Sequence, residues 1–230
     1  MEESVASSRA LRTPRAAAVA GVLFALLLTT ALVLVRTAVP GGPGDGSWLA
    51  DPGRRRQVIL ALNLVPFSGI AFLWFIGVVR DRIGEREDRF FATVFLGSGL
   101  LFIAMLFVAS AVAAGSLADL AARGGAAGDG SGFNRRIGGL ILHTYAMRMA
   151  AVFTISTATI GLRTGFLPRW LVFAGYAIAL ILLLVIDVTP WVELLFPLWI
   201  LLVSLDTLVT SFRRKETERL ASTDQLLPRK

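Results

Sequence analysis

Cysteine is absent from this chain of 230 residues, and histidine occurs only once, as His143. The lack of cysteine excludes disulfides, thiolate metal sites, iron–sulfur clusters and thiol nucleophiles. A single histidine argues against a b-type haem protein, which needs two axial histidines, and no HExxH motif of a zinc protease is present. We therefore expect neither a cofactor nor a metal site, and the sequence identifies no catalytic residue.

Charged residues are scarce as well. They make up 17% of the chain, whereas hydrophobic residues make up 55%, and an average soluble domain is about 25% charged. This composition is typical of a membrane protein. The net charge of +7 does not indicate nucleic-acid binding, because the charges lie at the ends of apolar runs. Basic residues there set membrane orientation and contact anionic lipid headgroups.

Long apolar runs are what the sequence has in abundance. A hydrocarbon core about 30 Å thick needs roughly 20 apolar helical residues, and backbone groups in lipid must be paired within a helix. The sequence therefore predicts an all-α polytopic membrane protein, a six-transmembrane-helix bundle. Its first run exceeds the 7–15 residues usual for a signal peptide, so we expect it to be retained as an anchor. The six predicted spans are 16–35, 57–79, 90–114, 137–162, 170–188 and 191–212.

The basic residues predict the orientation. With the N-terminus in the cytoplasm, the inner segments hold 15 lysines and arginines and the outer segments hold 7. The positive-inside rule thus places both tails, 1–15 and 213–230, in the cytoplasm. The composition, rich in Ala, Gly, Leu, Val and Arg, indicates a bacterial source, so we expect a multi-pass protein of the bacterial cytoplasmic membrane.

Three consecutive arginines, Arg54, Arg55 and Arg56, count against this orientation because they fall in an outer segment. We expect them, together with the basic inner loops, to bind anionic lipid headgroups, or alternatively to bind a periplasmic partner. A homo-oligomer or another membrane protein as partner also remains open.

Two charges lie near the predicted middle of the membrane. Arg148 is about 17 Å below the outer end of its span, and Asp206 is about 22 Å below the outer end of the last one. Charges at such depth are costly and are paired or functional. We predict an interhelical ion pair between Arg148 and Asp206. Either this pair fixes the register of the helices, or Arg148 lines a polar cavity and binds an anionic group.

A second group of polar residues falls in the outer third of the membrane. Asn63, His143, Asp187 and Glu193 all lie at this depth, and we predict that they line an outward-facing polar pocket, the alternative being that each packs separately. Prolines fall inside two of the spans, and an internal proline removes a helical hydrogen bond. We therefore predict helix kinks at Pro66 and Pro197.

Two stretches resemble a known group of proteins. The segments "PFSGIAFLWFIGVVRDRIGEREDRFFATVFLGSGLLF" (66–102) and "YAMRMAAVFTISTATIGLRTGFLPRWLVFAGY" (145–176) are similar to uncharacterised small multispanning membrane proteins of actinobacteria, a family with a domain of unknown function. The resemblance covers roughly half of the chain. It implies a six-helix membrane protein and supplies no activity.

The sequence leaves three functions open. The first is a non-enzymatic bundle that binds a small molecule or lipid, senses membrane state or supports a partner complex, and we favour it. The second is a small transporter or channel with a polar path near Arg148 and Asp206. The third is an intramembrane lipid-acting enzyme that uses His143 as acid or base.

Overall fold

The computed structural model describes residues 13–39, 48, 51–83, 89–122, 131–184 and 191–225. All the regular elements in these ranges are helical, as the sequence predicts. They are α2 (Thr13–Ala38), α3 (Pro52–Ile83), α4 (Arg89–Ala122), α5 (Ser131–Leu140), the π-helix η3 (Ile141–Ala146), α6 (Met147–Thr164), α7 (Arg169–Leu184), the 3₁₀ helix η4 (Val192–Leu194) and α8 (Leu195–Gln225).

Five helical stretches in the described ranges are long and apolar enough to cross a membrane, and they indicate a multi-pass membrane protein. The sixth expected span, 170–188, corresponds to α7, whose 16 residues extend about 24 Å. Its last predicted residues, 185–188, lie outside the described part of the chain. The five candidate spans are Ala18–Ala38, Pro52–Arg80, Phe90–Asp119, Arg136–Thr164 and Val192–Ser211.

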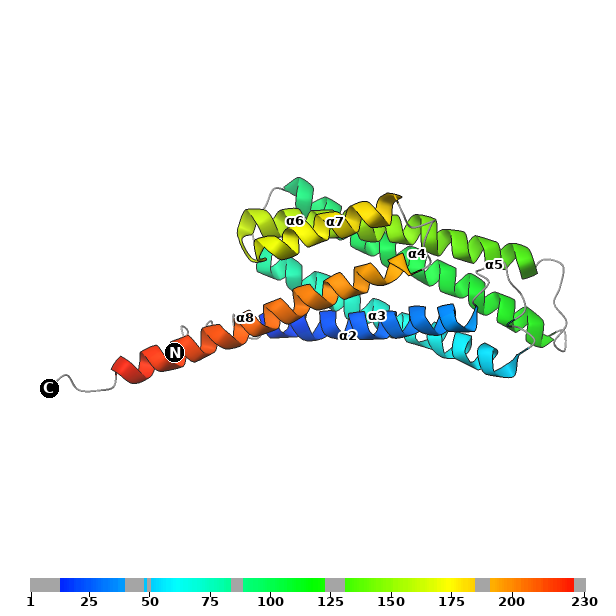
Figure 1. Ribbon diagram of the computed structural model, residues 1–230, viewed down its shortest axis with the longest axis horizontal. Helices are drawn as coiled ribbons and strands as arrows, with labels where there is room; N and C mark the ends of the chain where they lie inside the picture. Colours follow the sequence, from blue (N-terminus) through cyan, green and yellow to red (C-terminus); the bar gives the residue numbers. More distant parts are fainter. Residues whose placement is uncertain are drawn as a thin grey trace.

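The helices form two groups that run roughly along one direction (Figure 1). In one group α2 packs along both α3 and α8; in the other, α4 packs against α5, η3 and α6, and α7 lies along α6. Contacts between α3 and α4 join the two groups. α5, η3 and α6 follow one another without a break, so that residues 131–164 form one continuous helical rod.

Five fully buried phenylalanines hold the groups together, each from a different helix. Within this phenylalanine cluster, contacting rings have centroids 4.4–6.3 Å apart. Aromatic rings at such separations attract one another beyond their apolar burial. The cluster comprises Phe24 of α2, Phe72 of α3, Phe102 of α4, Phe153 of α6 and Phe196 of α8.

Helix α7 is attached through hydrogen bonds and close packing. Trp199 of α8 donates from Nε1 to the carbonyl oxygen of Leu171 at 3.1 Å. The hydroxyls of Thr159 and Tyr176 are 2.9 Å apart and join α6 to α7. At Gly175 the indole of Trp199 lies so close that a Cβ would stand only 2.9 Å from its Cζ2 atom. The glycine therefore lets α7 approach α8.

Replacing Gly175 with alanine is expected to lower the melting temperature of the purified protein in detergent by several degrees. The added methyl group would force the buried indole of Trp199 to move and would strain its hydrogen bond to Leu171. Gly77→Ala is the control, because a Cβ at Gly77 meets nothing within 4 Å and alanine favours the helix by up to about 1 kcal/mol. Equal melting temperatures for the two variants would contradict this packing role.

The prolines and the C-terminal helix refine the sequence predictions. α3 continues through Pro66, and a kink there stays a prediction. Pro197 is the third residue of α8, in the first turn, where a helix tolerates the missing amide. α8 continues to Gln225, beyond the expected end at 212, and extends away from the bundle (Figure 1). Arg54, Arg55 and Arg56 belong to the start of α3.

Candidate functional site

A cavity of about 150 Å³ lies between helices α2 and α3 on one side and α4, α5 and η3 on the other. Its walls are mainly apolar because each of the long helices presents small or aliphatic side chains to it. Representative wall residues are Leu32 and Val35 of α2, Ala61 and Val65 of α3, and Leu106 and Ala109 of α4.

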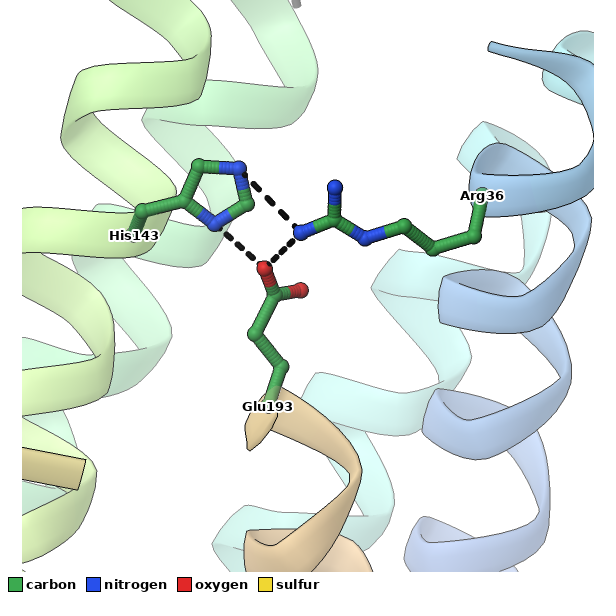
Figure 2. Close-up of polar contacts among 3 residues, drawn as sticks. All are labelled: Arg36, His143 and Glu193. Atoms are coloured by element: carbon green, nitrogen blue, oxygen red, sulfur yellow. Dashed lines mark hydrogen bonds and ion pairs between the residues drawn. The ribbon is translucent and has the colours of Figure 1, made fainter. Parts of the chain in front are cut away.

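Three polar side chains from distant parts of the sequence meet at this cavity (Figure 2). Arg36 comes from the last turn of α2, His143 from the π-helix η3 and Glu193 from η4. Arg36 forms an ion pair through Nη2 with Oε1 of Glu193, and Nδ1 of His143 contacts the same carboxylate oxygen. The Nη2 atom of Arg36 also lies 3.4 Å from Nε2 of His143.

The contacts of this Arg36–His143–Glu193 triad define one arrangement of its protons. A guanidinium only donates hydrogen bonds, so Nε2 of His143 must accept from Arg36. The neutral imidazole then carries its proton on Nδ1 and donates it to Glu193. With this tautomer the net charge of the triad is zero.

Burial makes the pairing of Glu193 necessary. The side chain of Glu193 is only 3% exposed, and those of Arg36 and His143 are 15% and 21% exposed. An isolated carboxylate at such depth would lose its hydration without compensation. The pairing with Arg36 and the contact from His143 supply that compensation, and they also join α2 and η3 across the cavity through Glu193.

The local helix geometry around His143 is unusual. Residues Ile141–Ala146 form a π-helix, a wider turn that is rare and is often found at functional sites. Leu142 and His143, which are adjacent in sequence, both line the cavity. Just before them, Gly138 and Gly139 also line it, and their missing side chains leave space in this wall.

Trp48 provides the other polar group near the cavity. The residue is 4% exposed and packs with Ala38, Val39 and Val58, and it lines the cavity. Its indole Nε1 is buried and has no hydrogen-bond acceptor in the protein. The sequence predicts Trp48 as an anchor at the membrane interface, whereas the structure places it inside the bundle.

The structure places the predicted pocket residues differently from one another. His143 and Glu193 come into contact. Asn63 is exposed and is not one of the cavity-lining residues, and Asp187 lies outside the described residues. Arg148 is half-buried and donates from Nη1 to the carbonyl oxygen of Thr144 at 3.0 Å, and its ion pair with Asp206 stays a prediction.

Arg36 and Trp48 are the two site residues that the sequence analysis misses. Arg36 directly follows the first apolar run, and a cation at that position reads as a topology signal. Its depth provides the useful clue, because it lies at the same predicted outer boundary as Glu193 and carries the opposite charge. Trp48 stands in a segment rich in Gly and Pro, which gives no signal of burial.

No protein-family model, curated protein or solved structure matches this chain. Within the described residues, no three His, Asp or Glu side chains are grouped so that they could hold a metal ion. The site therefore consists of an apolar cavity, a neutral triad and a buried indole N–H.

Proposed function

We propose that this protein is a non-enzymatic membrane protein that binds a small molecule or lipid in the cavity beside Arg36, His143 and Glu193. The observation that carries the proposal is the union of an apolar cavity with a few placed polar groups, because binding sites for small molecules commonly have this composition. The cavity supplies the apolar contact area, and the triad and Trp48 supply the orienting groups.

The phenylalanine cluster favours binding over transport. Phe24 and Phe102 lie one helical turn before the cavity residues Leu28 and Leu106, and Phe196 lies three residues after Glu193. Fully buried aromatic rings therefore follow the cavity along each of these helices. A through-path for a polar solute would have to displace them, whereas a pocket that ends at them needs no such movement.

Arg36 also favours binding over catalysis by His143. A carboxylate that holds a histidine is a common arrangement for a general base. In this triad, however, Nε2 of His143 faces the Nη2 atom of Arg36 at 3.4 Å. The lone pair that would remove a proton from a substrate is already engaged by a cation.

We also propose six spans with both termini in the cytoplasm of a bacterium, with α7 as the span additional to the five longer helices. This topology rests on the distribution of basic residues and places the cavity near the outer face of the cytoplasmic membrane. Arg54, Arg55 and Arg56, at the start of α3, would then lie beside anionic headgroups.

A cavity-filling variant tests whether the cavity binds a ligand. Ala109→Phe adds a ring to a buried wall residue of α4, and we expect it to abolish the bound mass that native mass spectrometry detects on gently extracted wild-type protein. The control, Ala104→Phe, makes the same change at an exposed position of the same helix and should keep the ligand.

Equal occupancy in both variants, or no bound mass on the wild type, would contradict the proposal. Overpacking costs typically 1–3 kcal/mol, so Ala113→Phe, at another wall position, replaces Ala109→Phe should that variant fail to accumulate.

A further inference from the structure

We propose that the ligand of this cavity is an uncharged molecule that places a carbonyl oxygen near Trp48 and Arg36 and an apolar group about the size of one ring in the cavity. This inference rests on the proposed binding function and adds the chemical class of the ligand. Three properties of the cavity carry it: its charge balance, its unused donors and its volume.

The charge balance favours an uncharged ligand. Among the cavity-lining residues in the described part of the chain, only Arg36, His143 and Glu193 are ionisable. Arg36 and Glu193 neutralise each other, and the hydrogen-bond arrangement of the triad requires a neutral imidazole. An anionic or cationic ligand would therefore bring an unpaired charge into an apolar space, which is strongly unfavourable.

The unused polar groups at the cavity include donors that seek an acceptor. Nε1 of Trp48 is buried without a partner, and a buried donor without an acceptor destabilises the site. Arg36 makes its contacts to the triad through Nη2, so its Nη1 and Nε remain for a ligand. Ser110, in contrast, already donates its hydroxyl proton to the carbonyl oxygen of Leu106 at 2.8 Å. A ligand carbonyl oxygen matches these donors.

The volume limits how much of the ligand the cavity encloses. A cavity of about 150 Å³ lined by apolar side chains accommodates a group the size of benzene. A lipid would therefore place only its carbonyl and the adjoining carbons inside. Esters, ketones and quinones of the membrane share this chemistry.

Four ten-carbon probes separate charge from hydrogen bonding: methyl decanoate, decanoate, decylammonium and decane. Each is titrated into the full-length protein in phosphatidylcholine nanodiscs, and apparent affinities are taken from the rise in melting temperature, which ligand binding produces by mass action. We expect methyl decanoate to bind at least tenfold more tightly than the other three. Ala109→Phe should abolish the rise and Ala104→Phe should keep it.

Trp48→Phe tests the donor, because it retains the aromatic ring and removes only the N–H. Since the N–H of Trp48 has no acceptor in the free protein, this variant is expected to fold normally. Its affinity for methyl decanoate should fall about three- to tenfold, the effect of one hydrogen bond, and its affinity for decane should stay unchanged.

Tighter binding of decanoate or decylammonium would overturn the inferred charge class, and an unchanged ester affinity in Trp48→Phe would overturn the role of Trp48. Both outcomes leave the binding function intact as long as Ala109→Phe abolishes the response. No difference between wild type and Ala109→Phe for any probe would overturn the inferred ligand class, and the ligand retained by the wild type in mass spectrometry then decides the binding function separately.

Discussion

Replacing Glu193 with glutamine is expected to destabilise the protein by about 3–5 kcal/mol, the usual cost of removing one partner from a buried ion pair. The substitution keeps the shape of the side chain and leaves the guanidinium of Arg36, only 15% exposed, without its counter-charge. The measurement is the loss of melting temperature in detergent, together with the level of folded protein in the membrane.

Two further variants separate charge pairing from general damage. Asp51→Asn removes the same kind of charge from the exposed Arg54–Asp51 pair, whose atoms are 3.5 Å apart, and asparagine still caps the start of α3. An exposed pair contributes at most about 1 kcal/mol, so the control should stay close to wild type. Combining Arg36→Met with Glu193→Gln removes both charges and should recover most of the lost stability.

A Glu193→Gln variant as stable as Asp51→Asn would show that the triad does not hold the bundle together. A double variant less stable than Glu193→Gln alone would show that Arg36 stabilises the protein in another way, without regard to Glu193.

The helical architecture is readable from the sequence because an apolar run long enough to cross a membrane has no alternative to a helix. The five longer spans follow from this length rule. The sixth differs because the helix around 170–188 ends at Leu184 in the described residues. The π-helix at Ile141–Ala146 carries no sequence signature, since it changes the hydrogen-bond spacing by only one residue.

The candidate site is readable in part. Depth alone groups His143 with Glu193, because both lie near the outer end of their helices. Arg36 escapes this reasoning because an arginine at the end of an apolar run is normal for any membrane protein. Its pairing with Glu193 joins residues 157 positions apart, and only the packing of α2 against the start of α8 reveals it.

The phenylalanine cluster illustrates a limit of sequence patterns in membrane proteins. In a soluble helix the apolar face identifies the core, but a membrane helix is apolar on both its lipid face and its protein face. Phe67 and Phe72 therefore look equivalent in the sequence of α3. In the structure Phe67 is 62% exposed and Phe72 is fully buried.

This difference gives the second large expected effect. Phe72→Ala should lower stability by about 3–5 kcal/mol, as for large-to-small changes in packed cores, whereas Phe67→Ala on the same helix should have little effect. Phe72 contacts more rings than any other phenylalanine among the described aromatic pairs, with partners Phe24, Phe75, Phe102, Phe153 and Phe196. Removing its ring therefore loosens the contacts among α2, α3, α4, α6 and α8 at once.

Thermal unfolding in the same detergent compares the two alanine variants directly. A melting temperature of Phe72→Ala equal to that of Phe67→Ala would contradict the central role of the cluster. Ligand binding adds a second readout, because the cluster lies just below the cavity along α2, α4 and α8. If these rings form the floor of the cavity, Phe72→Ala should also weaken binding at the site, whereas Phe67→Ala should leave it unchanged, since Phe67 faces away from the core.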